Sequence, residues 1–279
     1  MATILITGAS SGIGEAAALL LAKDHAVTAT VRTESARDAL IAKAATAGVS
    51  VEVALLDVCD LDAVRGLVAR LETAGGIDVL VHNAGTGFVG TLEQLDLGEL
   101  RRALEVNFFG AAQTIQAVLP GMRTRGHGRI LAVSSVGGAV GQPFNDAYCA
   151  AKFALEGLLE SLAPVAAAVG IAISIIEPGP VATKFIANVQ GLDAVLDGGA
   201  DDPYASAKAN YMARLGAPER MVGMQTSEDV AQVIAEVIST PTPALRYQTS
   251  TWSTAFVATK LHDVTGDAVI SMTSAWVAD

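Results

Sequence analysis

The chain has 279 residues, of which 51% are hydrophobic and 17% are charged. This composition supplies a large apolar core and excludes an intrinsically disordered chain. The formal net charge of -11 excludes the strongly basic surface that nucleic-acid binding or a polybasic membrane patch requires.

The first predicted elements are a strand, a glycine-rich turn and a helix. Residues 3–7, Thr-Ile-Leu-Ile-Thr, indicate a buried parallel strand, and the Ala/Leu-rich segment 15–23 indicates a helix. The turn between them, Gly8-Ala-Ser-Ser-Gly12-Ile-Gly14, lets the backbone approach a pyrophosphate at the helix N-terminus. A plain strand-to-helix turn is the alternative. The expected cofactor contacts are Gly8, Ser10, Ser11, Gly12, Ile13 and Gly14.

The second predicted strand, 26–31, ends at Arg32. An acidic residue at this point binds the ribose 2′-hydroxyl of NAD, whereas an arginine accommodates the 2′-phosphate of NADP. Arg32 favours NADP(H) over NAD(H), with Ser11 as a second phosphate contact. Glu34 is the one residue that favours NAD, and a solvated loop charge is the other interpretation of Arg32.

The third and fourth predicted strands end in polar residues. After a helix over 35–47, the strand Val49–Leu56 leads to Asp57, which can accept from an adenine amino group or lie in the N-cap region of a helix over 60–72. These two roles are compatible. The strand 78–82 leads to Asn83, which we expect to pin the loop through its backbone at the ligand-binding sheet edge. The cofactor contacts expected here are Asp57, Val58, Asn83, Ala84 and Gly85.

Asn107 lies among apolar residues in the helix predicted over 99–119. A buried amide is costly unless it is hydrogen-bonded. Asn107 is therefore either a satisfied core amide or the mark of a local kink that holds a water.

Tyr148 and Lys152 lie four residues apart on a helix predicted from Tyr148 to about Val169, and so share one face. The ammonium can favour the phenolate and lower its pKa from about 10 toward the working range. The fifth predicted strand, 129–134, brings Ser135 to the same sheet edge. This arrangement suits moving a proton on and off an alcohol or carbonyl oxygen. A Tyr-x-x-x-Lys alone is a weak motif, and two surface side chains are the alternative.

The remaining elements complete the predicted sheet. A strand over 171–176 precedes a segment expected to close over a nicotinamide, and a helix over 227–238 precedes a strand over 244–249. Strands that alternate with helices predict an α/β fold, a doubly wound parallel seven-stranded sheet in the order 3-2-1-4-5-6-7. The expected cofactor contacts in the closing segment are Pro178, Gly179, Val181 and Thr183.

We predict one Rossmann-type domain over 1–279, with an insertion at about 186–222 as a substrate lid. The pattern of 250–279 assigns no element. Cys59 and Cys149 are too few for a disulfide framework, and Cys149 is expected to be a small buried residue. The N-terminus lacks a signal sequence, and no apolar run approaches the length of a membrane span. These features predict a soluble, cytoplasmic protein without membrane insertion.

The motifs Thr7–Gly14, Asp57, Asn83–Gly85, Asn107, Ser135, Tyr148-x-x-x-Lys152 and Pro178–Thr183 occur in one order. In that order they resemble the short-chain dehydrogenase/reductase family over roughly residues 1–250. The run from Ser135 through Tyr148-Cys-Ala-Ala-Lys-Phe-Ala-Leu-Glu-Gly-Leu looks closest to the 17β-hydroxysteroid and retinol dehydrogenase branch. Ala29-Thr-Val-Arg32 and Ala244-Leu-Arg-Tyr247 fit the same branch.

The resemblance implies a role for each residue of the site. Tyr148 would be the general acid/base, and Lys152 would lower its pKa and hold the nicotinamide ribose. Ser135 would position the substrate oxygen, and Asn107 would anchor a water that links Lys152 to solvent. Hydride would pass between NADP(H) and a secondary alcohol or ketone, with no metal. The resemblance also implies a homodimer or homotetramer formed through the helices that hold Asn107 and Tyr148.

Two departures from the family pattern bear on the substrate. Ala151 replaces a serine that often precedes the lysine. Steroid-specific members place a histidine in the lid, but the histidines here, His25, His82, His127 and His262, all lie outside 186–222. We therefore expect a bulky hydrophobic or aromatic small-molecule alcohol or ketone, with a steroid disfavoured.

Two other functions fit the same scaffold. A lyase or epimerase would recycle its cofactor, but such relatives usually have a G-x-x-G-x-x-G loop and a larger C-terminal domain. A non-enzymatic cofactor sensor would typically have lost the tyrosine or the lysine. The spacing of Gly8, Gly12 and Gly14 speaks against the first, and Tyr148 with Lys152 speaks against the second.

Overall fold

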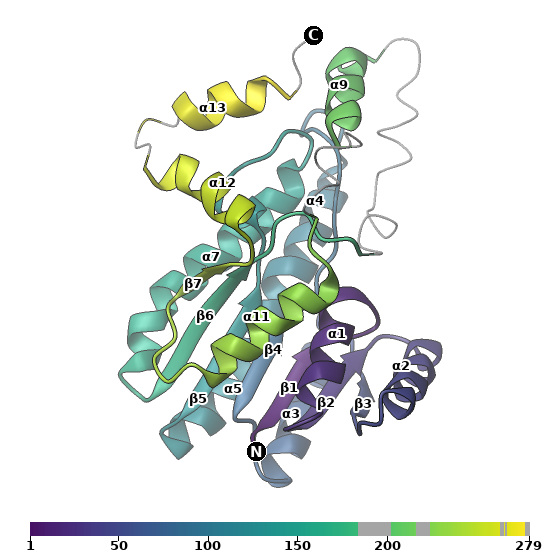
Figure 1. The fold of residues 1–279 in the computed structure, drawn as a ribbon, viewed down its shortest axis with the longest axis vertical. Helices are drawn as coiled ribbons and strands as arrows, with labels where there is room; N and C mark the ends of the chain where they lie inside the picture. Colours follow the sequence, from purple (N-terminus) through teal and green to yellow (C-terminus); the bar gives the residue numbers. More distant parts are fainter. Residues whose placement is uncertain (184–201, 216–223, 263–264, 266, 277–279) are drawn as a thin grey trace.

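A parallel sheet forms the centre of the molecule (Figure 1). The computed structural model describes residues 1–183, 202–215, 224–262, 265 and 267–276. The sheet has seven strands in the order β3-β2-β1-β4-β5-β6-β7, as predicted. They are β1 (Thr3–Thr7), β2 (Ala26–Val31), β3 (Glu52–Leu55), β4 (Val79–His82), β5 (Gly128–Val133), β6 (Ile171–Glu177) and β7 (Arg246–Gln248). The predicted seventh strand was too long, because only Arg246–Gln248 pair with β6.

The central strands are apolar on both faces because helices cover both faces. Ile4, Leu5 and Ile6 of β1 are each at most 1% exposed, and Ile4 pairs with Val27 on one side and Val79 on the other. Side chains alternate along a strand, so Leu5 enters one core while Ile4 and Ile6 enter the other. A continuous apolar run therefore builds two cores at once.

The two cores lie on opposite faces of the sheet. The first is packed by α3 (Leu61–Thr73), α5 (Gly110–Arg125) and α7 (Asp146–Ala167). The second is packed by α1 (Gly12–Leu21), α2 (Glu34–Thr46) and α11 (Ser227–Ser239), and Figure 1 shows α1 and α11 crossing in front of the strands. This is the doubly wound arrangement that the alternating pattern predicted.

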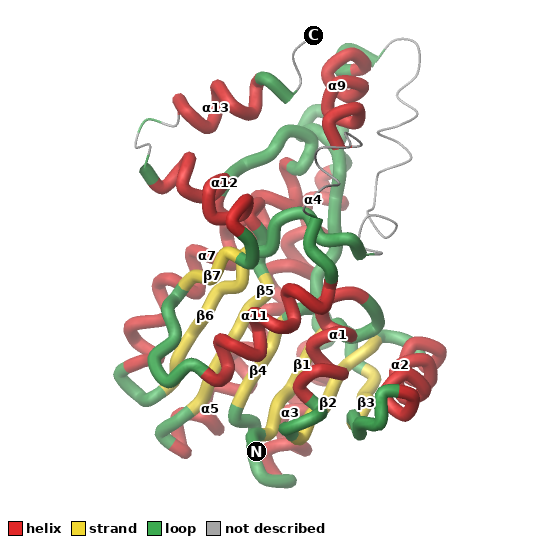
Figure 2. Tube along the Cα trace, in the orientation of Figure 1, coloured by secondary structure: helices red, strands yellow, loops and turns green. Residues whose placement is uncertain are grey.

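Further helices lie beyond the carboxyl ends of the strands. The tail, to which the sequence pattern assigned no element, contains α12 (Thr251–Leu261) and α13 (Asp267–Ser274). Figure 2 shows these two helices with α9 (Ala205–Leu215) above the sheet. Of the lid predicted over 186–222, residues 202–215 are described and include α9, and the rest lies outside the described residues. None of the described helices combines the length and apolar character needed to cross a membrane.

The helix predicted over 99–119 is interrupted at Asn107. It consists of α4 (Leu97–Leu104), a π-helical turn η1 (Glu105–Phe109) and α5. The Asn107 side-chain amide donates to the carbonyl of Ala103, 3.1 Å away, and to that of Thr86, 2.9 Å away. The predicted local irregularity is therefore present, and it is a π-helical turn.

Candidate active site

The turn between β1 and α1 is built for a close approach of backbone and ligand. Gly8 has φ +72°, and a Cβ placed on it would lie 2.6 Å from Ala84 Cα. A Cβ on Gly14 would lie 2.4 Å from Asn83 Nδ2 and 2.5 Å from the Gly8 carbonyl oxygen. Ser11 is the N-cap of α1 but its side chain makes no capping bond, so the first N–H groups of α1 are not capped by it. These unclaimed donors and the helix dipole fit a pyrophosphate.

Asn83 pins this turn, as predicted. Its side-chain amide donates to the Gly8 carbonyl at 2.8 Å and to the Thr7 carbonyl at 3.3 Å. In return, Thr7 Oγ1 accepts from the backbone N–H groups of Asn83 and Ala84, each at 3.1 Å. The ends of β1 and β4 are thereby locked together at the ligand-binding edge.

Arg32 and Asp57 lie at the tips of neighbouring strands β2 and β3. Arg32 follows β2 directly and is exposed, while Thr33 caps α2 by accepting from the Ala36 N–H. Asp57 is exposed and accepts from the Cys59 N–H at 2.9 Å. The N-cap of α3 is Asp60, not Asp57, because the Asp60 carboxylate is the one that reaches the Ala63 N–H. Asp57 therefore shapes the loop that holds Val58 and Cys59.

Asn107 and Lys152 meet beneath Gly85. A Cβ placed on Gly85 would lie 2.8 Å from Asn107 Oδ1 and 3.6 Å from Lys152 Nζ. Asn107 is 1% exposed, and its Oδ1 accepts from the Thr86 N–H at 3.1 Å. The Asn107 side chain thus fixes the loop after β4, directly beside the lysine.

Ser135, Tyr148 and Lys152 form one cluster at the end of β5. Ser135 is the N-cap of the short helix α6 (Val136–Ala139), and its Oγ accepts from the Gly137 N–H at 3.0 Å. Tyr148, in the first turn of α7, is hydrogen-bonded to Ser135. Lys152 Nζ lies 5.9 Å from the centroid of the Tyr148 ring and donates to the Val133 carbonyl at 2.9 Å. The structure thus brings together the four residues assigned to catalysis, with Asn107 behind the lysine.

The electrostatics of this cluster differ from the sequence-based expectation. Burial raises the pKa of Tyr148 above its ordinary value, and the Ser135 hydrogen bond opposes that rise. Burial also lowers the pKa of Lys152 to about 8, while the Glu156 carboxylate opposes that change. The net direction is therefore opposite to the lowering expected from Lys152, because desolvation of the buried phenol outweighs the effect of the ammonium charge.

The segment after β6 folds back toward the glycine turn. The Pro178 carbonyl accepts from the Val136 N–H at 3.0 Å, which ties the segment to α6. Val181 forms a parallel bridge with Gln225, and the Ala182 N–H donates to the Gln225 carbonyl at 2.8 Å. A Cβ on Gly12 would lie 3.4 Å from Thr183 Cγ2. This segment, with Pro178, Gly179, Val181 and Thr183, therefore lies at the same sheet edge as the glycine turn and Ser135.

An apolar wall, which sequence reasoning missed, packs around α6, the short helix that begins after Ser135. It is formed by Val136, Ala139, Val140, Phe144, Tyr211, Phe256, Val257 and Trp276. Phe144 has φ +58°, and its ring packs against Tyr211 with centroids 5.4 Å apart. Tyr211 Oη in turn accepts from Asn145 at 2.7 Å, which links α9 to the start of the Tyr148 helix. The aromatic residues of the tail were the one available signal for this wall.

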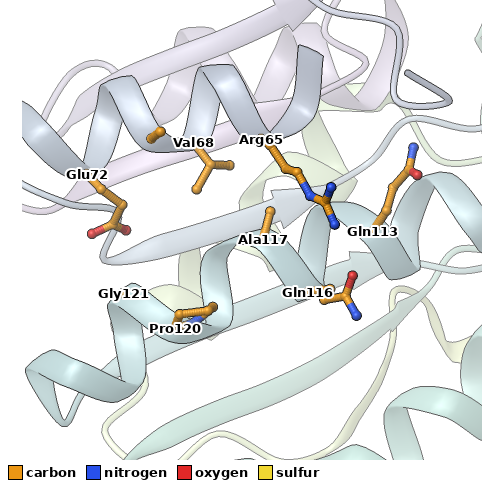
Figure 3. A pocket seen from close by; sticks show the side chains of 9 residues that line it. Arg65, Val68, Glu72, Gln113, Gln116, Ala117, Pro120 and Gly121 are labelled. Carbon is orange, nitrogen blue, oxygen red and sulfur yellow. The ribbon is translucent and has the colours of Figure 1, made fainter. Parts of the chain in front are cut away.

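A groove between α3 and α5 lies apart from this cluster (Figure 3). It is lined by residues including Arg65, Glu72, Gln113 and Gln116. None of the residues assigned to catalysis or cofactor binding lines it. The candidate site lies instead at the carboxyl ends of β1, β4, β5 and β6, where open α/β sheets bind ligands.

A doubly wound sheet, a glycine turn and a Ser-Tyr-Lys cluster at one sheet edge together define a dinucleotide-dependent oxidoreductase. The chain belongs to the short-chain dehydrogenase family, whose model, described as short chain dehydrogenase, matches residues 2–191. Similarity to retinol and hydroxysteroid dehydrogenases places it in the branch that the sequence motifs indicated. It is accordingly an enzyme of a nicotinamide-binding family that acts on alcohol and keto groups.

Two curated relatives span nearly the whole chain. Retinol dehydrogenase 8 of Homo sapiens is 40% identical over 281 residues, covering 97% of this chain and 88% of its own length. The 17-beta-hydroxysteroid dehydrogenase type 1 of Homo sapiens is 40% identical over 277 residues, covering 96% of this chain and 83% of its own.

Two solved structures share the fold. A short-chain dehydrogenase from Streptomyces avermitilis has a TM-score of 0.79 and 30% identity, with 100% of this chain and 98% of that chain covered. A single-substitution variant of actinorhodin polyketide ketoreductase with NADPH has a TM-score of 0.74 and 28% identity, with 88% and 95% covered.

Proposed function

We propose that the protein transfers a hydride between NADP(H) and a bulky hydrophobic or aromatic secondary alcohol or ketone. The observation that carries this proposal is the contact of Tyr148 with Ser135, with Lys152 on the same helix beneath them. A proton donor, a hydrogen-bonding hydroxyl and a buried cation therefore converge at the foot of an apolar wall. In the reduction direction, Tyr148 gives its proton to the carbonyl oxygen.

The residues around the reacting oxygen have separate roles. Ser135 Oγ accepts from Gly137, so its own proton is available to a phenolate or a substrate oxygen. In the oxidation direction, the Tyr148 phenolate takes the hydroxyl proton, and Lys152 stabilises that phenolate by its charge. Asn107 holds the loop beside Lys152 and anchors a water through which the proton reaches solvent. When bound, the nicotinamide supplies or accepts the hydride.

The chain's own residues fit a dinucleotide. The pyrophosphate would lie on the α1 N-terminus, held by Gly8, Ser10, Ser11, Gly12, Ile13 and Gly14. The adenosine would lie near Arg32, Asp57 and Val58, and the nicotinamide ribose near Lys152, Tyr148 and Asn83–Gly85. Pro178, Gly179, Val181 and Thr183 would cover the nicotinamide. Gly8 and Gly14 leave no room for a side chain, which supports a loop shaped around a closely approaching ligand.

The choice of NADP over NAD rests on the tip of β2. Arg32 is exposed there beside the glycine turn, where its charge can meet a 2′-phosphate. Glu34 would be the competing ribose ligand, but its carboxylate lies 3.8 Å from Arg37 Nη1 within its own helix. We therefore assign the choice of cofactor to Arg32, which directly follows β2.

The apolar wall supports a bulky substrate. Phe144, Tyr211, Phe256 and Trp276 belong to the same apolar cluster as Val136, the residue after Ser135, and these side chains are at most 6% exposed. Two 40% identical relatives are named for retinol and for a hydroxysteroid. The absence of histidine from 186–222 still disfavours a steroid. We propose residues 1–279 as one domain, with the lid over 186–222 closing on the substrate.

The proposed assembly is a cytoplasmic homodimer or homotetramer. Phe109 on η1 is 49% exposed, and Val165 on α7 is 66% exposed. These apolar side chains lie on the two helices that hold Asn107 and Tyr148. Burying them against a second copy would remove apolar surface from water, which supports association through these helices.

Arg32→Ala should weaken NADPH far more than NADH. Loss of one charge-assisted phosphate contact predicts a drop in kcat/KM for NADPH of about 10- to 100-fold, with little change for NADH. The assay follows NADPH or NADH absorbance with a panel of aryl ketones, alkyl ketones, retinoids and steroids. Equal losses with both cofactors would refute the role of Arg32, and no turnover of any compound with either cofactor would refute the proposed function.

A further inference from the structure

A buried polar cluster lies directly beneath the Ser135–Tyr148 site. Its members lie on β6, β7 and α7 and directly after β5: Ser134, Glu156, Glu177, Arg246 and Gln248. Glu177 is 0% exposed and Glu156 is 3% exposed. Buried carboxylates are costly unless they are paired and hydrogen-bonded, so this cluster needs an explanation.

The contacts account for every carboxylate oxygen in the cluster. Ser134 Oγ donates to Glu156 Oε1 at 2.6 Å, and Arg246 Nη1 donates to Glu156 Oε2. The same Arg246 nitrogen donates to Glu177 Oε1 at 2.6 Å, and Gln248 Nε2 donates to Glu177 Oε2 at 2.6 Å. Two buried carboxylates thus share one guanidinium, and with both carboxylates ionised the cluster carries a surplus negative charge.

Lys152 is a buried cation, and its positive charge can balance this surplus negative charge. It lies one helical turn before Glu156 on α7, and residues four apart are neighbours on a helix. It is 4% exposed, and its recorded hydrogen bond is to a neutral acceptor, the Val133 carbonyl. Burial lowers the pKa of Lys152 to about 8, and the Glu156 carboxylate is the charge that opposes this effect.

Other charged groups face the pair from the surrounding elements. They are Tyr148 and Glu160 on α7, His82 on β4, Glu177 on β6, Arg246 on β7 and Lys260 on α12. Burial lowers the pKa of His82 to about 3, so His82 is neutral at physiological pH and adds no charge beside Lys152. Lys260 is a cation, and Glu160 is 63% exposed at the far side of Arg246. Glu156 is therefore the acidic residue whose negative charge favours the charged form of Lys152.

We propose that Glu156 is a positioning residue of the reaction, the counter-charge of Lys152 and the anchor of the strand end that carries Ser135. The inference rests on the proposed function, because it assigns Lys152 the task of stabilising the Tyr148 phenolate. Burial and the neighbouring Glu177 charge raise the pKa of Glu156, whereas the hydrogen bonds from Ser134 and Arg246 oppose that rise and hold the carboxylate in its place.

The same carboxylate also fixes the position of Ser135. A Cβ on Gly138 would lie 2.1 Å from Glu156 Oε1 and 2.4 Å from Ser134 Oγ, so α6 packs directly on this hydrogen bond. Ser134 and Ser135 are adjacent, and Ser135 begins α6. A shift of Glu156 would therefore move the residue that contacts the substrate oxygen.

Glu156→Gln should move the pH profile of the reaction. As pH rises through the pKa of Lys152, its charge is lost, and ketone reduction then falls. Removing the Glu156 charge lowers that pKa further, so the falling limb of kcat/KM with NADPH should move to lower pH by about one unit. Glu160→Gln is the matched control, since Glu160 also contacts Arg246. In this variant the falling limb of kcat/KM should stay at its wild-type pH. Glu156→Asp, which keeps the charge, should restore most of the wild-type profile.

A uniform loss of activity across pH in Glu156→Gln, or a shift equal to that of Glu160→Gln, would overturn the proposal. If Glu156→Gln does not fold, the triple variant Glu156→Gln/Glu177→Gln/Arg246→Met serves instead. It removes the same net charge and leaves no charged member of the cluster unpaired, so it should show the same shift. The pH dependence of NADPH binding, followed by fluorescence, should shift likewise and needs no turnover. Failure of the proposed function is thereby distinguished from failure of the Glu156 assignment.

Discussion

Tyr148→Phe is expected to abolish turnover while NADPH still binds. Tyr148 is the group that gives the proton to, or takes it from, the substrate oxygen, and proton transfer of this kind contributes about 10²- to 10⁴-fold in rate. The ring remains in the variant, so packing in the first turn of α7 is kept. We therefore expect kcat to fall by on the order of 10³-fold or more.

The measurements are NADPH oxidation with a bulky ketone and NADPH binding by fluorescence. Tyr247→Phe is the matched control, because its hydroxyl accepts from the Ala244 N–H at the edge of the sheet, away from Ser135. It should turn over substrate as the wild type does. Activity retained in Tyr148→Phe would refute the assignment of Tyr148 as the general acid/base.

Gly14→Ala is expected to cause a large loss of cofactor binding. The added methyl would lie 2.4 Å from Asn83 Nδ2 and 2.5 Å from the Gly8 carbonyl oxygen, so the bond that pins the glycine turn must break or shift. Overpacking of this kind costs about 1–3 kcal/mol of stability. Displacing a positioning group by about 1 Å can cost roughly 100-fold, so NADPH affinity should fall by on the order of 10- to 100-fold.

Gly66→Ala provides the matched control for this substitution. Gly66 lies within α3, and a Cβ there meets no atom within 4 Å. Alanine in a helix interior should stabilise the protein by about 0.5–1 kcal/mol and leave NADPH binding unchanged. The thermal midpoint and the Kd for NADPH are measured for both variants. Wild-type affinity in Gly14→Ala would show that the turn does not form the cofactor site.

The strand order and the glycine turn could be predicted from the sequence because each depends on local pattern. A continuous apolar strand predicts burial on both faces of the sheet. The glycine-rich run Gly8–Gly14 between a strand and a helix predicts the turn that joins them. Asn107 likewise marked the π-helical turn, since an amide among apolar residues needs nearby backbone partners. In each case the interacting residues lie close together in the sequence or at the ends of strands whose order could be predicted.

The apolar wall and the Glu156 cluster could not be predicted because their members are distant in sequence. Glu156 and Arg246 are 90 residues apart, and each alone resembles an ordinary solvated charge. Phe144 and Tyr211 meet only because α9 packs above the sheet. The net direction of the Tyr148 pKa shift could not be predicted for a related reason: spacing shows which residues share a face, but desolvation depends on everything packed around them.

Transfer of deuterium from NADPH in which both C4 hydrogens of the nicotinamide are replaced by deuterium tests the central claim most directly. The substrate is the best ketone of the panel, and mass spectrometry locates the label after turnover. Direct hydride transfer places one deuterium on the carbinol carbon of the product alcohol for each NADP formed. Product formed while the label stays on the cofactor, with no net NADPH consumed, would instead indicate a lyase or epimerase that recycles its cofactor and would contradict the proposed oxidoreductase.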